Sequence, residues 1–178
     1  MNREVHVREA RCADAEAISR IGLEVMPLQY AGLVDPAAVQ AAIDQTYAVG
    51  AVEACISRCR SAEDGHFLVA EADHAVVGFL HFDAFGPEPE LHRLYVDPRA
   101  RGAGIGGALM RVLHEELRPP ARYMLLVVAG NDRAVTFYQR HGLEIAERVD
   151  GLAYYRERMG VEFPPSTRPF DMVLMRRR

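Results

Sequence analysis

The stretch Arg101-Gly102-Ala103-Gly104-Ile105-Gly106-Gly107 lies between a strand-like segment and an amphipathic one. Because glycine has no Cβ atom, such a turn lets backbone N–H groups close on an anion. Leu109, Val112, Leu113 and Leu117 follow at helical spacing, so we expect a helix directly after the turn. The amides and the positive dipole end of a helix N-terminus favour a phosphate. The stretch therefore predicts a strand, a glycine turn and a helix that together hold a phosphorylated ligand.

Gly102, Gly104 and Gly107 also match the spacing of the dinucleotide-binding fingerprint. In that fingerprint the glycines follow their strand almost at once, whereas residues 97–101 intervene here. The fingerprint also requires an acidic residue that binds the ribose. Asp132 is a poor candidate for it, because it comes late in the sequence and beyond a glycine. No Gly-Lys-Ser/Thr follows the turn, which excludes a P-loop. A dinucleotide-dependent oxidoreductase is therefore the less favoured alternative.

Two sequence blocks, taken together, favour another ligand. The first is Arg101-x-x-Gly104-x-Gly106 after Leu94-Tyr95-Val96-Asp97-Pro98, and it resembles the pyrophosphate loop of the GNAT superfamily of acyl-CoA-dependent N-acyltransferases. The second has the four residues that mark the helix after the fifth strand in that superfamily, namely Asn131, Ala134, Tyr138 and Gly142. The resemblance is strong over residues 90–149 and weak elsewhere. It implies an α/β fold with a GNAT-like mixed central sheet and helices on both faces, in a single domain.

The resemblance also implies acetyl-CoA as co-substrate and a set of residues that bind it. Backbone groups of Leu94, Tyr95 and Val96 would hold the pantetheine arm, and the amide near Leu94 would meet the thioester oxygen. The pyrophosphate would lie on the glycine turn, with added charge from Arg101. The other implied cofactor-binding residues are Gly102, Ala103, Gly104, Ile105, Gly106, Gly107, Asn131, Arg133 and Tyr138.

The strand before the glycine turn carries two candidate bases. Glu90, His92, Leu94 and Val96 share strand parity, so we expect them on one face. The positions of the family's usual base correspond to Glu90 and His92. We expect Glu90 to act as the base with His92 assisting, and the reverse assignment stays open. Tyr138 is the candidate general acid for the departing thiolate, because a phenol with a pKa of about 10 can donate a proton at neutral pH.

The predicted function is N-acetyl transfer from acetyl-CoA to an amine, directly within a ternary complex. No Ser-His-Asp or Cys-His signature lies near the motifs, so a covalent enzyme intermediate has no obvious nucleophile. A non-catalytic acyl-CoA sensor is an alternative from another class. The acceptor, a small-molecule or peptide amine, cannot be identified from the sequence.

Composition limits the other functional classes. The chain has 178 residues, 49% of them hydrophobic, which suits one domain with a full core. No apolar run approaches the length of a membrane span, and residues 1–6 lack the apolar stretch of a secretory signal, so we expect a cytoplasmic protein without a membrane partner. A net charge of −4 gives no basis for nucleic-acid binding, and the arginines at 176–178 are expected to be a solvated end. A homodimer remains open.

Three cysteines, Cys12, Cys55 and Cys59, fit a reducing compartment. Cys55 and Cys59 would share a helix face at i, i+4, but no Cys or His pair nearby in the sequence completes a tetrahedral metal site. We therefore expect buried structural thiols and no metal.

Hydrophobic periodicity predicts the remaining elements. They are a strand at 5–10, a helix from Asp14 that stops before Pro27, helices from 36 and over 49–60, a hairpin of 66–71 with 75–82, strands at 90–96 and 123–128, a helix at 131–140 and closing strands. Residues 162–169 contain three prolines and cannot be a central strand. We expect an insertion near 152–169 that covers the acceptor site, meets a second subunit or is an ordinary surface loop, within one domain over 1–178.

Overall fold

A seven-stranded mixed sheet forms the centre of the computed structural model, which describes residues 5–62, 65–86, 88–117 and 122–177. The predictions about the start of the chain and its last arginine rest partly on 1–4 and 178, which lie outside these ranges. The strand order is β1-β2-β3-β4-β5-β7-β6. The strands are β1 (His6–Glu9), β2 (His66–Ala72), β3 (Ala75–Asp83), β4 (Glu90–Val96), β5 (Tyr123–Val128), β6 (Glu144–Asp150) and β7 (Asp171–Arg177).

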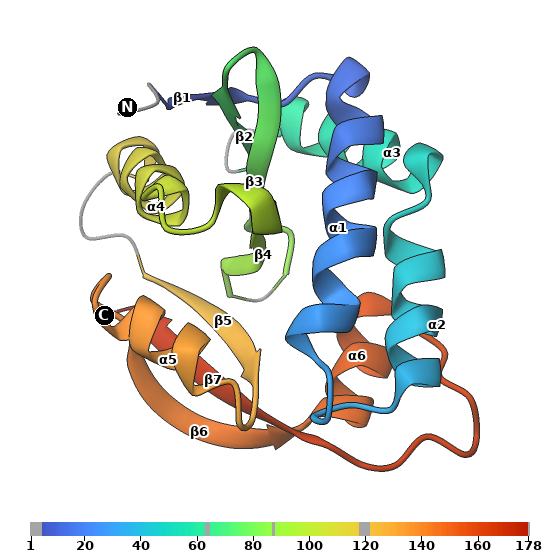
Figure 1. Ribbon diagram of the computed structural model, residues 1–178. Coiled ribbons are helices and arrows are strands. Elements are labelled where there is room, and N and C mark those ends of the chain that lie inside the picture. Colours follow the sequence, from blue (N-terminus) through green and yellow to red (C-terminus); the bar gives the residue numbers. More distant parts are fainter. Residues whose placement is uncertain (1–4, 63–64, 87, 118–121, 178) are drawn as a thin grey trace.

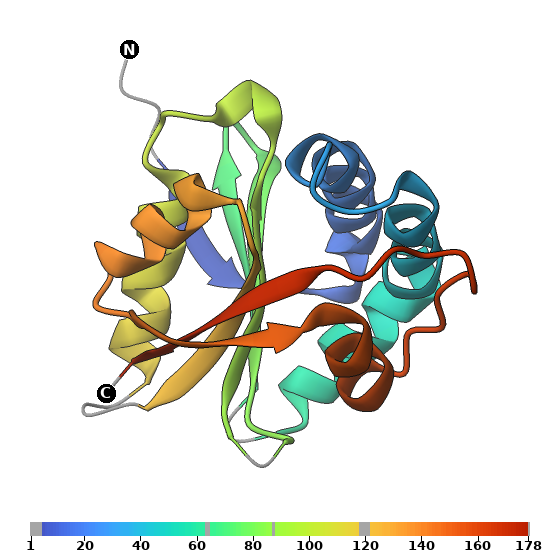
Figure 2. The same cartoon turned by 90° about the horizontal axis from the view of Figure 1, so that it is seen from below.

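Helices cover both faces of this sheet, as predicted (Figures 1 and 2). One face carries α1 (Ala15–Gln29), α2 (Pro36–Thr46), α3 (Val49–Arg60) and α6 (Gly151–Met159). The other face carries α4 (Ile105–Glu116) and α5 (Asp132–Gln139). Each face has its own apolar core, one around α1–α3 and one around α4. Within the described ranges, no helix combines the length and apolar character needed to cross a bilayer.

Strands β4 and β5 diverge, and this divergence positions the site. They pair in parallel at Glu90 and Met124, the one register pair that joins them among the described residues. On its other side β4 continues antiparallel to β3 as far as Val96, which pairs with Gly78. The glycine turn and α4 follow where β4 has parted from β5. A cleft therefore opens between two neighbouring strands of one sheet.

Two helix predictions need correction. The helix predicted to stop before Pro27 continues to Gln29. Pro27 removes the donor to the Leu23 carbonyl, but both residues are exposed, so water can replace that hydrogen bond. Part of the region expected to be an insertion is α6, which was not predicted. Asp150 accepts a hydrogen bond from the Ala153 amide at its start, and Gly160 ends it at φ 63°. With three helices before β2, the order is β-α-α-α-β-β-β-α-β-α-β-α-β.

Candidate active site

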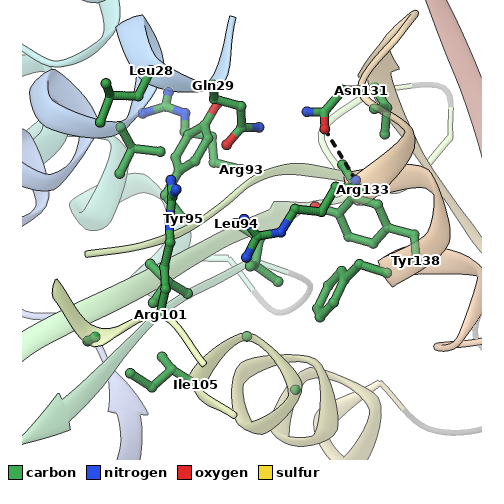
Figure 3. Close-up of a pocket in the computed structure, with 18 of the residues that line it drawn as sticks. Leu28, Gln29, Arg93, Leu94, Tyr95, Arg101, Ile105, Asn131, Arg133 and Tyr138 are labelled. Atoms are coloured by element: carbon green, nitrogen blue, oxygen red, sulfur yellow. Dashed lines mark hydrogen bonds between the residues drawn. The ribbon is translucent and has the colours of Figure 1, made fainter. Parts of the chain in front are cut away.

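The cleft between β4 and β5 contains a cavity of about 470 Å³ (Figure 3). Its walls come from α1, β4, the glycine turn, the start of α4, β5 and α5. Most of the predicted cofactor-binding residues line it, namely Leu94, Tyr95, Val96, Arg101, Gly102, Gly104, Ile105, Gly106, Gly107, Asn131, Arg133 and Tyr138. Of the other predicted residues, His92 borders the cavity, whereas Ala103 and Glu90 are not part of its lining. Segments as far apart in the sequence as Val25 and Tyr138 thus converge on one cavity, whose volume is common for ligand sites.

The glycine turn has the backbone geometry that the sequence predicted. Gly102 and Gly104 have φ values of 85° and 74°, which side chains with a Cβ atom disfavour. Gly104 is the N-cap of α4, so the amides of residues 105–107 form the first helical turn. Among the described backbone hydrogen bonds, none is donated by these three amides. They are available to an anion at the positive end of the helix dipole.

Backbone alternation along β4 separates the three residues predicted to hold pantetheine. The Asp97 amide donates to the Val77 carbonyl at 2.8 Å, so the backbone groups of Tyr95 also face β3 in this antiparallel ladder. Those of Leu94 and Val96 point away from β3, toward the cleft. Tyr95 lines the cavity with its side chain instead, and its hydroxyl lies 3.0 Å from that of Tyr30.

The α5 side of the cavity presents polar groups (Figure 3). Asn131 caps the helix, because its Oδ1 accepts a hydrogen bond from the Ala134 amide at 3.2 Å. Tyr138 extends toward the middle of the cavity, and burial raises the pKa of its phenol above the ordinary value. The Tyr138 hydroxyl therefore stays protonated at neutral pH and can act as a donor.

A β-bulge changes the predicted parity of β4. His81 pairs with Arg93, whereas the next residue of β3, Phe82, pairs with Leu91. His92 is therefore an extra residue on β4, and such a residue reverses the alternation of the side chains that precede it.

The expectation that four β4 side chains share one face is wrong for two of them. Leu94 and Val96 pack against the core around α4. Glu90 and His92 contact side chains on the opposite face, where α6 lies. Without the bulge, all four side chains would lie on one face of the sheet. The sequence pattern alone therefore could not show that two of them lie on the opposite face.

A second cavity, of about 710 Å³, lies on the face that carries Glu90 and His92. Its walls come from α2, α3, the end of β3, the start of β4 and α6. His92 and Arg93 border both cavities. The bulge on β4 is therefore the partition between them.

Glu90 is a buried carboxylate held by several donors. The Tyr154 hydroxyl donates to its Oε1, and Arg158 Nη2 donates to its Oε2 at 3.2 Å. His92 Nδ1 lies 3.4 Å from Oε1. Burial alone would raise the pKa of Glu90, but His92, Tyr154 and Arg158 hold it below its ordinary value. Glu90 is ionised at neutral pH.

His92 lies between two carboxylates. Its Nε2 is 3.1 Å from Asp83 Oδ1, opposite the contact of Nδ1 with Glu90. Burial alone would lower the pKa of His92, but Asp83 and Glu90 outweigh it and raise this pKa to about 9. Neither ring nitrogen is aligned for a directed hydrogen bond with a described residue, so both contacts are primarily ion pairs.

Comparison with known proteins supports the predicted family. Residues 63–145 match the family model described as an acetyltransferase (GNAT) domain. A spermidine N(1)-acetyltransferase of Thermoplasma acidophilum is 25% identical over 156 residues, which cover 86% of this chain and 96% of that protein. Both matches are consistent with the GNAT superfamily of acetyltransferases that the sequence motifs predicted.

Further similarities agree with this assignment. The N-alpha-acetyltransferase RimI of Mycobacterium tuberculosis is 30% identical over 95 residues, 51% of this chain and 60% of RimI. A crystal structure of a PaiA N-acetyltransferase from Thermoplasma acidophilum in complex with coenzyme A has the same fold. Its TM-score is 0.79 at 21% identity, over 98% of this chain and 99% of that one.

The GNAT fold argues against the dinucleotide alternative. In this chain β4 is antiparallel to β3 and parallel to β5, so the glycine turn belongs to a mixed sheet. The dinucleotide fingerprint belongs instead to a parallel, doubly wound sheet.

Sequence reasoning missed several residues of the second cavity. Tyr154 and Arg158 hold Glu90 from a helix that was not predicted. His81 was not singled out from the sequence, yet it is 2% exposed, and its Nε2 lies 3.1 Å from Asp83 Oδ2. A signal did exist for α6, because Asp150 and Gly160 are a typical cap pair. No local signal links His81 and Asp83 to His92.

Proposed function

We propose that this protein transfers an acetyl group from acetyl-CoA to an amine by direct attack in a ternary complex. The observation that carries the proposal is the position of His92, which borders both cavities together with Arg93 and is the one of these two whose side chain can act as a general base. Acetyl-CoA occupies the cavity between β4 and β5, which we call the donor cavity. The amine enters through the second cavity, which we call the acceptor cavity. The thioester carbon and the attacking nitrogen then meet beside the same imidazole, as transfer without a covalent enzyme intermediate requires.

The donor cavity supplies binding groups along the length of acetyl-CoA. The free amides of residues 105–107 receive the pyrophosphate, with charge from Arg101 and Arg133. The cleft-facing backbone of Leu94 and Val96 holds the pantetheine arm as an added strand. The Leu94 amide donates to the thioester oxygen as negative charge develops there, and one such donor contributes about 3 kcal/mol of transition-state stabilisation.

His92 is the proposed general base, with Glu90 as the group that orients it. An imidazole with a pKa of about 9 is better matched to an alkylammonium than a carboxylate whose pKa lies below its usual range. His92 borders both cavities, whereas Glu90 borders only the acceptor cavity. The proposal thus reverses the division of roles expected from the sequence. The carboxylates of Glu90 and Asp83 stabilise the imidazolium that forms.

Tyr138 is the proposed acid for the departing thiolate. Its phenol lines the donor cavity on the side opposite α1 and remains protonated at neutral pH (Figure 3). Collapse of the tetrahedral intermediate breaks the C–S bond, the electron pair goes to sulfur, and the proton of Tyr138 converts that sulfur to the CoA thiol. The tyrosinate then regains a proton from solvent.

A CoA-release assay tests this function against the sensor alternative. Purified full-length protein is incubated with acetyl-CoA and pooled primary amines, and free thiol is measured beside a thermal shift with acetyl-CoA alone. We expect a stabilising shift and amine-dependent thiol release. A shift without thiol release for any pool would support the sensor, and absence of a shift at saturating acetyl-CoA would contradict both assignments.

A further inference from the structure

Two cysteines and a histidine from different elements meet beneath the acceptor cavity. Cys55 and Cys59 lie one turn apart on α3, and His81 comes from β3. A ligand atom from each of the three lies within 4.8 Å of the other two. All three residues are buried, with exposures of 5%, 1% and 2%. The predicted burial of the two thiols is confirmed, but their histidine neighbour was not predicted.

The thiol of Cys55 approaches the edge of the His81 ring. Phe67 on β2 stacks against this ring at 5.1 Å, and His92 on β4 stacks at 4.8 Å. Because β2 and β4 flank β3 on opposite sides, these stacks cover both faces of the imidazole. Cys55 Sγ lies 3.7 Å from Nδ1 and 3.4 Å from Nε2, so the sulfur meets the edge of the ring that carries both nitrogens. A thiolate sulfur and an imidazole nitrogen on one tetrahedral zinc ion are about 3.6 Å apart, given their usual bond lengths.

A carboxylate contacts the ring at Nε2. His81 Nε2 lies 3.1 Å from Asp83 Oδ2. A carboxylate at one imidazole nitrogen fixes that nitrogen as the donor, which leaves the other with its lone pair for a metal. Cys55, His81 and Asp83 also line the 710 Å³ cavity, so an ion has a route from solvent.

We propose that Cys55 Sγ, Cys59 Sγ and His81 Nδ1 bind a divalent zinc ion. Two thiolates and one imidazole are donors that zinc prefers, and both thiols lose their protons when it binds. A water from the acceptor cavity completes the tetrahedron. The ion joins α3 to β3 and so stabilises one wall of that cavity. This proposal is independent of acetyl transfer and revises the expectation of no metal.

The test measures metal in the full-length protein, purified without chelator from zinc-supplemented cells. We expect about one zinc per chain in the wild type and in the Cys12→Ser control, whose cysteine is exposed and lies outside the cluster. The double variant Cys55→Ser/Cys59→Ser should lose nearly all of it. Replacement by Co²⁺ should give a near-ultraviolet thiolate-to-cobalt band and the visible bands of a tetrahedral site.

Two results would overturn the zinc site. Zinc far below one per chain, together with cobalt spectra that lack the thiolate band, would mean that the three side chains are only a hydrogen-bonded core. Equal zinc in the wild type and the double variant would place the ion elsewhere. A cooperative thermal unfolding transition followed by circular dichroism verifies that the double variant is folded, and if it does not fold, the wild-type cobalt spectrum decides alone.

Discussion

The two cavities that meet at His92 are built in different ways. The donor cavity takes its key groups from backbone, the amides of residues 105–107 and the cleft-facing groups of Leu94 and Val96. The acceptor cavity takes its groups from side chains on α2, α3, β3, β4 and α6. A backbone site depends on local turn and strand geometry, whereas a side-chain site depends on how distant segments pack. Substitutions that distort the backbone of the donor cavity should therefore weaken acetyl-CoA binding. Substitutions of side chains at the partition should change proton transfer.

The largest expected effect is at the partition between the cavities. His92→Gln removes the base but keeps a polar side chain of similar reach, so kcat/KM should fall by about 10³-fold. Acetyl-CoA affinity should change little, because the backbone of the donor cavity is intact. Steady-state kinetics and calorimetric titration measure the two quantities. His6→Gln, at an exposed histidine of β1, is the control and should match wild type. Full activity in His92→Gln would show that His92 is not the general base.

Tyr138→Phe should give the next largest effect, a fall in kcat of about 10- to 100-fold with unchanged acetyl-CoA affinity. The variant keeps the aromatic ring but lacks the hydroxyl proton that Tyr138 gives to the departing thiolate. Tyr123→Phe is a matched control, because its hydroxyl lies 2.8 Å from His114 Nε2 and outside both cavities. A kcat in Tyr138→Phe equal to that of the control would contradict the acid role.

A smaller effect is expected when the backbone of the donor cavity is strained. Gly104→Ala places a Cβ atom at φ 74°, so the turn should relax and acetyl-CoA affinity should weaken by about 10-fold. Gly32→Ala creates the same strain at φ 76°, also with open space around the new atom, but away from the cavity. Both variants should lose similar thermal stability, and only Gly104→Ala should lose affinity. Equal acetyl-CoA titration curves for the two variants would mean that the glycine turn does not bind the cofactor.

The smallest effect is a shift in pH dependence. Unprotonated His92 is the active form, so kcat/KM should rise with pH through about 9 and then level off. Glu90→Gln removes one of the two carboxylates that stabilise the imidazolium, so this apparent pKa should move down by about one unit. The measurement needs an acceptor whose own ammonium pKa is below about 7, so that the amine does not titrate in the same range. An unchanged profile would mean that Glu90 does not act on His92.

The same contrast explains what the sequence could predict. The glycine turn and the helix that follows Asn131 are local features, and both appear as predicted. The expectation that Glu90 and His92 share a face with Leu94 and Val96 was wrong, because the bulge depends on pairing with β3. The contacts of Glu90 with α6 join residues 64 and 68 positions apart, which no periodicity encodes. Packing decides such contacts, so the sequence located the donor site better than the acceptor site.

A crystal structure with bound acetyl-CoA tests the central claim most directly, because it shows both ends of the ligand. We predict pyrophosphate oxygens within hydrogen-bonding distance of the amides of residues 105–107, and the thioester carbon beside His92 where the two cavities meet. A pyrophosphate bound away from those amides, or a thioester separated from His92 by the body of β4, would contradict the account.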